Sequence, residues 1–212
     1  MKRLGVISTA LSMLLGAAFA WAATDVEQFT VKGDAAEAFF SMKEGCDVTY
    51  VGVYAFEQAV RQKSAPAVIE SVVNVFIDVV DQCTWEYVTS AYGSAVLGVD
   101  DFVVGKKLSS ASLDAAVEVY EYITGNTMEV SLDVSWSAVE PLVKSSSRFT
   151  YKSEGFSVKG SFKGSFRSAK ATGGIEVDGS DLGLGQADYA AIMTLASSSM
   201  TKTPINQLFL NR

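Results

Sequence analysis

The side chains of this sequence that could do chemistry are carboxylates, because the chain contains no histidine. Without histidine it can form neither a Ser-His-Asp triad nor a Cys-His pair, and the histidine-based ligand sets of catalytic zinc and copper are also excluded. Two carboxylates could still cleave a glycosidic bond. We expect most acidic residues on solvated faces or in turns, so we predict no catalytic residue and keep a carboxylate-dependent glycan-active enzyme as an alternative. The candidates for that alternative are Asp78, Asp81, Asp100, Asp101, Glu118 and Glu121.

A second group of candidates is basic. Lys159, Lys163 and Arg167 recur at every fourth residue, which places them on one face of a single strand. Such a stripe could bind an anionic group, for example on a phosphorylated or sulfated glycan. The other interpretation is a solvated face, on which the stripe pairs with Glu129 and Asp133 of the preceding hairpin or protects an edge strand.

Two tyrosines are candidates for stacking against a sugar. Tyr120 and Tyr122 fall on the polar side of an alternating segment, so we predict that both are exposed ligand-binding residues. Trp136 shares its face with Val134 in a later segment, and we predict that it lies in the core.

No motif predicts a metal site or a cofactor. The glycine-rich segment 178–185 contains Asp178 and Asp181, but it lacks the ligand spacing and the closing glutamate of an EF-hand loop. We therefore predict a turn in this segment, no metal and no cofactor.

The two cysteines, Cys46 and Cys83, predict one disulfide. An even number of cysteines in an oxidising compartment is typical of a structural bridge, and the close C-x-x-C spacing of redox pairs is absent. Each cysteine lies at the end of a predicted strand pair, so the bridge would join two turns at the same end of the sheet.

The start of the chain predicts export. Two basic residues precede an apolar run over residues 4–19, and residues 18–22 contain two A-x-A cleavage motifs. The run is short for a membrane-spanning helix. We predict a signal peptide over residues 1–22, a secreted or periplasmic protein, and no integral helical membrane protein.

The composition narrows the range of partners. The full chain of 212 residues has 17 basic and 24 acidic residues, and removing residues 1–22 would leave 15 basic residues and a formal charge of −9 on 190 residues. So acidic a chain binds nucleic acid poorly, because that affinity comes mainly from neutralising phosphates, and we predict no nucleic-acid partner. The length fits one all-β domain over residues 23–212.

Alternation of apolar and polar residues with period two predicts strands along most of the chain. It is clearest in a hairpin formed by residues 113–119 and 128–136 around Gly125 and Asn126, a pair that suits a tight turn.

A second hairpin covers residues 149–167 with its turn at residues 153–155. Glycines alternate with aromatic residues on the face that we predict to be buried, which indicates that rings from neighbouring strands cover the gaps. The glycines near residue 173 predict the end of this strand, and residues 175–177 would begin another.

The remaining segments are less regular. Residues 48–56 are apolar on both faces, which predicts a central strand, and residues 72–80 and 84–92 predict another strand pair. Residues 58–69 predict a loop or a short helix ended by a proline. Residues 187–200 fit either a helix or a strand.

The sequence therefore predicts an antiparallel β-sandwich of roughly ten strands with one disulfide. Its function would be that of an exported binding or structural module, associated with an extracellular glycan or another envelope component. One alternative is a small outer-membrane β-barrel, which shows the same alternation with its apolar side outward. A third class is a surface subunit that self-assembles through strand edges. Doubly apolar strands and a disulfide favour the sandwich.

Overall fold

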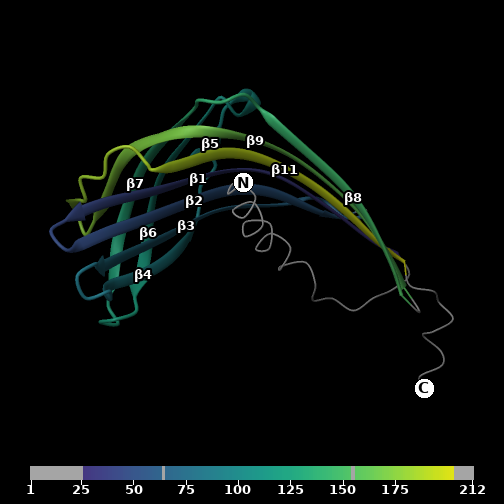
Figure 1. Ribbon diagram of the computed structural model, residues 1–212. Helices are drawn as coiled ribbons and strands as arrows, with labels where there is room; N and C mark the ends of the chain where they lie inside the picture. Colours follow the sequence, from purple (N-terminus) through teal and green to yellow (C-terminus); the bar gives the residue numbers. More distant parts are fainter. Residues whose placement is uncertain (1–25, 64, 154–155, 203–212) are drawn as a thin grey trace, which may run out of the picture.

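The computed structural model describes residues 26–63, 65–153 and 156–202, and most of these residues lie in antiparallel strands (Figure 1). The predicted signal peptide lies outside the described residues. One short 3-10 helix, η2 (Lys106–Leu108), stands between the fifth and sixth strands. The strands are β1 (Val26–Glu44), β2 (Asp47–Gln62), β3 (Val68–Asp81), β4 (Glu86–Val96), β5 (Phe102–Val104), β6 (Ser110–Glu121), β7 (Thr127–Ala138), β8 (Val143–Ser153), β9 (Phe156–Val177), β10 (Ser180–Asp181) and β11 (Tyr189–Lys202).

All eleven strands belong to one sheet. Its order is β10-β9-β11-β1-β2-β3-β4-β6-β5, and β7 pairs with both β6 and β9. Pairing can therefore be followed from β9 through β11, β1, β2, β3, β4, β6 and β7 back to β9, a closed path of eight strands. Every pairing is antiparallel, and the predicted antiparallel all-β class with one disulfide is confirmed. Where two layers of strands pack against each other, as in a sandwich, both layers belong to this one continuous sheet.

The long strands take part in two regions of this sheet. Residues 169–177 of β9 pair with β7, whereas residues 157–168 pair with β11 and residues 156–166 pair with β8. We call the region around β4, β6 and β7, where the pairing path closes, the closed part. Figure 1 shows a curved extension that leads away from it and ends at β8. We call this extension the open part; it consists of β8 and residues 156–168 of β9, 193–202 of β11, 26–35 of β1 and 56–62 of β2.

The hydrophobic core lies inside the closed part. Alternate residues of each strand point into it, for example Ala36, Ala38 and Phe40 of β1, all at most 2% exposed. Trp136 is 1% exposed, as predicted, and its indole nitrogen donates a hydrogen bond to the backbone carbonyl of Glu37 at 2.8 Å.

The outer face of the closed part is acidic. Asp114 of β6 lies directly opposite Asp133 of β7, and Glu118 lies opposite Glu129, with all four side chains exposed. Like charges in these positions repel. Apolar residues inside and charged residues outside are the reverse of the distribution that the outer-membrane alternative requires.

In the open part the apolar residues lie on the opposite face of the same strands. Val31, Gly33 and Ala35 of β1 alternate out of phase with Ala36 and the core residues that follow it. Four consecutive buried residues, 35–38, mark the point where the buried face changes. The strand therefore buries one face in the closed part, whereas in the open part its apolar residues lie on the other face, where Val31 and Gly33 are half-buried.

Strand β9 shows the same change of face. Phe162 and Phe166 belong to the face that we predicted to be buried, and they are half-buried, whereas the core residues Ala171 and Ile175 come from the other alternation. The expected covering of glycines is present, because the ring of Phe149 in β8 lies over Gly160 and leaves no room for a Cβ atom.

Several strand predictions can be compared with the structure. The hairpin of β6 and β7 is confirmed, although its loop has five residues, 122–126. The predicted loop over residues 58–69 is too long, because β2 continues to Gln62 and β3 begins at Val68, and the described residues between them, including Pro66, form the connection. The predicted break near residue 173 is also wrong, because β9 continues to Val177. Residues 189–202 form a strand.

None of the helices in the described part of the chain has the length and apolarity that crossing a membrane takes.

Candidate functional site

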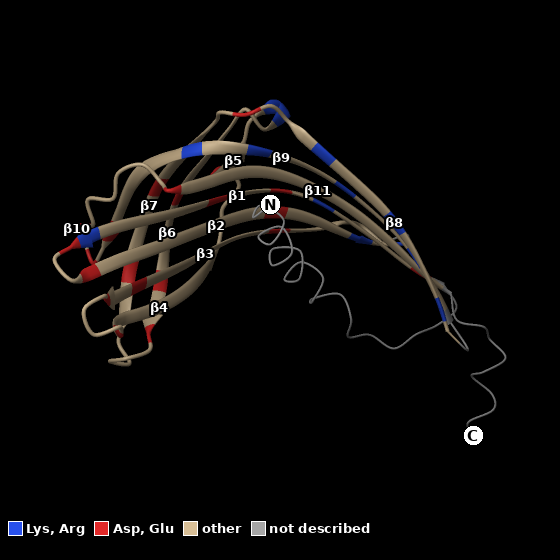
Figure 2. Cartoon of the chain, in the orientation of Figure 1, with Lys and Arg blue, Asp and Glu red and all other residues tan. Residues whose placement is uncertain are grey.

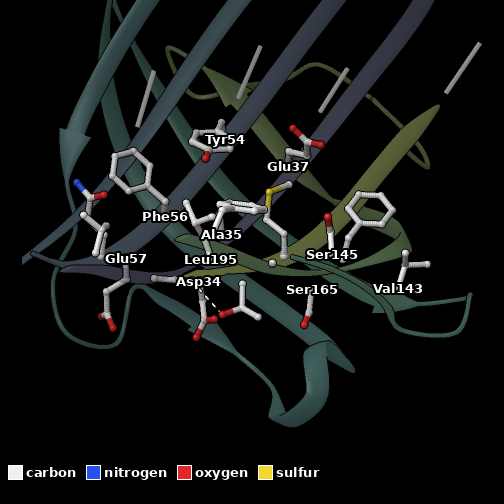
Figure 3. Close-up of a pocket in the computed structure, with 18 of the residues that line it drawn as sticks. Asp34, Ala35, Glu37, Tyr54, Phe56, Glu57, Val143, Ser145, Ser165 and Leu195 are labelled. Carbon is white, nitrogen blue, oxygen red and sulfur yellow. Dashed lines mark hydrogen bonds between the residues drawn. The ribbon is translucent and has the colours of Figure 1, made fainter. Parts of the chain in front are cut away.

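The candidate site is a groove on the apolar face of the open part (Figure 3). It has a volume of about 190 Å3 and is bounded by β1, β2, β8, β9 and β11. Figure 3 shows Tyr54, Phe56 and Glu37 on one side of the sheet and Asp34 and Glu57 pointing to the other. The apolar side chains that line the groove are Val31, Phe56, Val143, Phe162, Phe166, Met193 and Leu195.

The face that contains the groove is almost free of charge. Strand alternation assigns to it every second residue of five strands, and Glu37 is the only Asp, Glu, Lys or Arg among them. The stretches concerned are residues 143–153, 158–168, 189–201, 29–37 and 54–62. On the neighbouring strand β3, Glu70 lies on the same face, opposite Gln58. A ligand on this face therefore meets apolar groups along its length and a carboxyl at one end.

Glu37 lies at the end of the groove nearest the closed part and is only 7% exposed. The hydroxyl of Tyr189 donates a hydrogen bond to its Oε1 at 2.9 Å. Burial raises the pKa of Glu37, and the bond from Tyr189 offsets part of that effect. Within the described residues no cation and no second hydrogen-bond donor reaches this carboxyl, so one oxygen is free to accept from a ligand.

Two tyrosines flank Glu37. Burial, with the nearby charge of Glu37, raises the pKa of Tyr54 to about 12, and the same two causes raise the pKa of Tyr189. Both phenols are therefore neutral hydrogen-bonding groups at physiological pH. Together with Glu37 they form the polar end of the groove.

A row of aromatic rings supports this polar end. The ring of Phe39 lies 5.8 Å from that of Phe76 and 5.9 Å from that of Tyr189. The ring of Phe76 occupies the space above Gly52, where any Cβ atom would collide with it. Tyr189 of β11 is thus held in place against Glu37 by packing that begins three strands away, on β3.

Gln58 is the other polar side chain in the groove. Its amide nitrogen donates to Glu70 at 2.9 Å, and its Oε1 is buried without a hydrogen-bond partner. A buried unsatisfied acceptor is unfavourable, so this atom is a second place where a ligand donor would be stabilising.

The six acidic residues considered for catalysis do not converge on one site, and three of them accept local hydrogen bonds. The carboxylate of Asp81 accepts from the backbone of Cys83 and Thr84, and that of Asp101 accepts from Gly98. Asp78, Asp100 and Glu118 have no hydrogen bond from a described side chain, and they line no groove with Glu37.

Glu121 illustrates a purely local role. It accepts hydrogen bonds from the Thr124 hydroxyl and from the backbone of Ile123 and Thr124, with a longer one from Ser90. The hydroxyl of Thr124 and these amides lower the pKa of Glu121 to about 2, against the opposing effect of burial. This carboxylate closes the loop between β6 and β7.

The structure places the predicted basic stripe on β9, between β8 and β11. Lys159 and Lys163 are exposed, whereas Arg167 donates to the backbone carbonyls of Glu140 and Lys107. The proposed pairing with the acidic residues of β7 does not occur, because β7 contacts only residues 169–177 of β9, and this segment is not an edge strand. Neither Lys159 nor Lys163 forms an ion pair within the described residues.

The structure places the two predicted tyrosines at the other end of the molecule. Tyr120 and Tyr122 are 46% and 61% exposed, and their rings meet edge to face at 5.3 Å. Tyr120 pairs across the sheet with Tyr92 of β4. These residues are not part of the groove and do not lie near the basic stripe.

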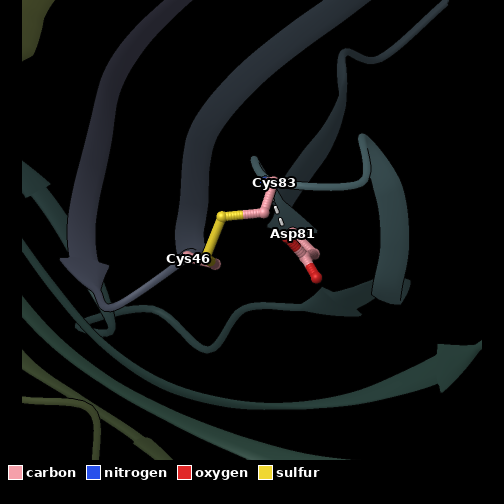
Figure 4. A group of neighbouring side chains, drawn as sticks. All are labelled: Cys46, Asp81 and Cys83. Atoms are coloured by element: carbon pink, nitrogen blue, oxygen red, sulfur yellow. Dashed lines mark hydrogen bonds between the residues drawn. A yellow bond between two sulfur atoms is a disulfide. The ribbon is translucent and has the colours of Figure 1, made fainter.

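The disulfide between Cys46 and Cys83 is confirmed, and it links the β1–β2 turn to the β3–β4 turn (Figure 4). The carboxylate of Asp81 lies beside the bridge. Both sulfurs are bonded to each other and offer no thiolate, so the three residues do not make a metal site.

The comparisons with known proteins leave the function open. No family model and no curated protein sequence matches the chain. A crystal structure of a Nitrosomonas europaea protein assigned provisionally as AttH has 14% identity and a TM-score of 0.23; the match covers 88% of this chain and 53% of that one. The outer membrane protein OprG of Pseudomonas aeruginosa has 12% identity and a TM-score of 0.14, with 85% and 98% covered. At these values neither neighbour carries an argument about function.

Sequence reasoning missed Glu37, Tyr54 and Tyr189. A signal was present, because Glu37 interrupts the apolar segment 35–40. A lone charge in such a segment is easily assigned to a solvated face, and only the packing of β1 against β2 and β11 shows that it is buried.

Proposed function

We propose that this chain is an exported binding protein that holds an apolar ligand, such as the alkyl chain of an envelope lipid, on the apolar face of its open part. The observation that carries the proposal is the groove, a mainly apolar surface with one carboxyl at its end. An apolar cavity of about 150 Å3 is enough to stay dry and bind benzene, so this groove has room for a short length of alkyl chain.

The surface continues beyond the groove. Phe149, Tyr151 and Val143 of β8 lie on the same face and are 53–59% exposed. Exposed apolar surface of this extent commonly marks a binding site. An elongated ligand that follows the strands would cover this surface, whereas a compact ligand would leave part of it exposed.

The polar end indicates the chemistry of the ligand's head. Glu37 has an oxygen free to accept, and its raised pKa shows that a negative charge is disfavoured there. A hydroxyl or an amine can donate to it, whereas a ligand carboxylate carries no donor hydrogen and would meet the same burial that disfavours the charge of Glu37. The expected ligand is an alkyl chain with a donating head.

Displacement of an environment-sensitive dye such as N-phenyl-1-naphthylamine tests this function. A fatty alcohol and a fatty amine should displace the dye better than the fatty acid of the same length. Leu195→Glu puts a charge in the groove and should abolish dye binding. Ala196→Glu is the matched control, because its side chain lies on the opposite face between Lys163 and Lys32. Equal loss in both variants, or no dye binding by the wild type, would contradict the proposal.

Fractionation of cells that express the full-length chain tests the export. Recovery of the mature protein from a detergent-free exported fraction supports it. Recovery only from membranes, with mobility that changes on heating, would overturn it in favour of the outer-membrane alternative.

A further inference from the structure

The face of the open part opposite the groove carries a second ordered feature. Strand register places Lys144, Arg148 and Lys152 of β8 on the same face as Lys159 and Lys163 of β9, since Arg148 pairs with Ser161, and Lys163 with Ser146. We call these five residues the basic ladder. The sequence pattern alone showed only its β9 half.

The spacing of the basic ladder is regular. Basic residues recur every four positions on each strand, about 13 Å apart at ~3.3 Å per residue. The two strands are offset by two residues, because Lys159 pairs with Thr150, midway between Arg148 and Lys152. Charges therefore alternate between the strands about every 7 Å along their direction. This is the pattern that a linear polymer with repeated negative charges would match.

The charges of the basic ladder are not neutralised within the molecule. None of the five residues forms an ion pair or a side-chain hydrogen bond with another described residue. The neighbouring strand β11 presents Thr194, Ala196, Ser198 and Met200 on this face, and the first acidic residues beyond it are Asp34 and Glu57. Figure 2 shows the basic residues along β8 and β9, and the acidic ones gathered on β6, β7 and the turns of the closed part.

Hydroxyl groups fill the positions between the charges. Ser146 and Thr150 alternate with the basic residues of β8, and Ser157, Ser161 and Ser165 alternate with those of β9. Hydroxyls can both donate to and accept from the hydroxyls of a sugar. The exposed acidic pairs of the closed part repel a densely charged nucleic acid more strongly than a polysaccharide whose charges are farther apart.

We propose that the basic ladder binds a linear anionic polysaccharide, which lies along β8 and β9. Arg167 is not part of this site, because its guanidinium is bonded to backbone carbonyls. The site is on the opposite face of the sheet from the groove, so it does not depend on the proposed apolar ligand.

Calorimetric titration of the whole chain with polygalacturonate tests the proposal, with neutral dextran and monomeric galacturonate as comparison ligands. Binding to the polymer should weaken steeply as salt increases, and the other two ligands should bind far more weakly. Reversing two charges of the basic ladder, Lys159→Glu with Lys163→Glu, should lower the affinity about tenfold or more. Arg148→Glu with Lys152→Glu should do the same.

The matched control reverses two basic residues outside the basic ladder, Lys106→Glu with Lys170→Glu, and should change affinity less than about twofold. Thermal melting of each variant separates loss of binding from loss of folding. Equal weakening by the control pair would show a general charge effect and overturn the proposal. Tighter binding of single-stranded DNA of equal charge, or salt-dependent self-association abolished by the ladder variants, would replace the glycan by a nucleic acid or by a second copy of this chain.

Discussion

The closed and open parts are built from the same strands but expose opposite faces. In the closed part Val51 and Val53 of β2 are at most 1% exposed, because the opposite walls of the sheet pack together. On the other face, Phe56 in the open part and Tyr54 at its border remain partly exposed. The described residues contain no element that packs over this face. One pattern therefore makes a core in one region and a partly exposed apolar surface in the other.

Charge separates in the same way. The closed part carries opposed acidic pairs on its outer face, whereas the open part carries the basic ladder. No ion pair joins the two regions in the part of the chain that the structure describes. Since these charges contribute little to holding the fold together, apolar packing and the disulfide must supply most of the stability.

Removing one large side chain from each region tests this difference most strongly. Trp136→Ala should destabilise the protein by about 3–5 kcal/mol, because it empties a fully buried position. Phe162→Ala, on the half-buried face, should cost under about 1.5 kcal/mol. Urea unfolding followed by circular dichroism measures both values. Similar costs would mean that the open part is packed as tightly as the core.

The disulfide should be nearly as important as the core. It closes a loop with a sequence separation of 37 residues, and a loop of this length is stabilised by about 3–4 kcal/mol on the chain-entropy model. Cys46→Ser with Cys83→Ser should lower stability by that amount, and reductant should do the same to the wild type. If the wild type keeps its melting temperature after reduction of the bridge, the closed part does not depend on it.

Glu37, between the two regions, should make stability fall as the pH rises. Its pKa is raised above its ordinary 4.5, so the folded state resists losing the proton and the wild type loses stability from pH 4.5 up through the raised pKa. Glu37→Gln keeps the bond from Tyr189 and removes the charge, so it should stabilise by about 1–3 kcal/mol at pH 8. At pH 3.5 the two proteins should melt together. A difference independent of pH would contradict this assignment.

Glu121 in the closed part should behave in the opposite way and with the smallest effect. Its pKa of about 2 means that its bonds stabilise the fold above its ordinary 4.5 and that this contribution is lost as the pH falls toward 2. Thr124→Val removes the hydroxyl whose hydrogen bond does most to lower the pKa of Glu121. The variant should therefore melt below the wild type at pH 7 and close to it at pH 2. Thr127→Val, at the start of β7, is a control that should show no such pH dependence.

A prediction from the sequence was accurate where its signal came from residues close together in the chain, and it was less accurate where strand pairing decided the outcome. The β6–β7 hairpin and the cysteine pair rest on local patterns, and both are confirmed. The predicted loop over residues 58–69 was too long, because pairing with β1 and β3 extends β2 to Gln62 and begins β3 at Val68, while Pro66 lies in the short connection between them. The exposed tyrosines are confirmed as exposed, but their binding role stays a prediction, as does that of the β9 lysines.

The sequence by itself determined that the chain forms antiparallel strands with one bridge, because period-two alternation and two cysteines act over short distances along the chain. Only the tertiary structure decided which face of each strand is covered, because that depends on which strands meet across the sheet. This is why Glu37 came to lie buried beside Tyr54 and Tyr189, residues that are distant in sequence. It is also why the lysines of β9 gained three basic neighbours from β8, because only the register between the two strands places Lys144, Arg148 and Lys152 on the same face as these lysines.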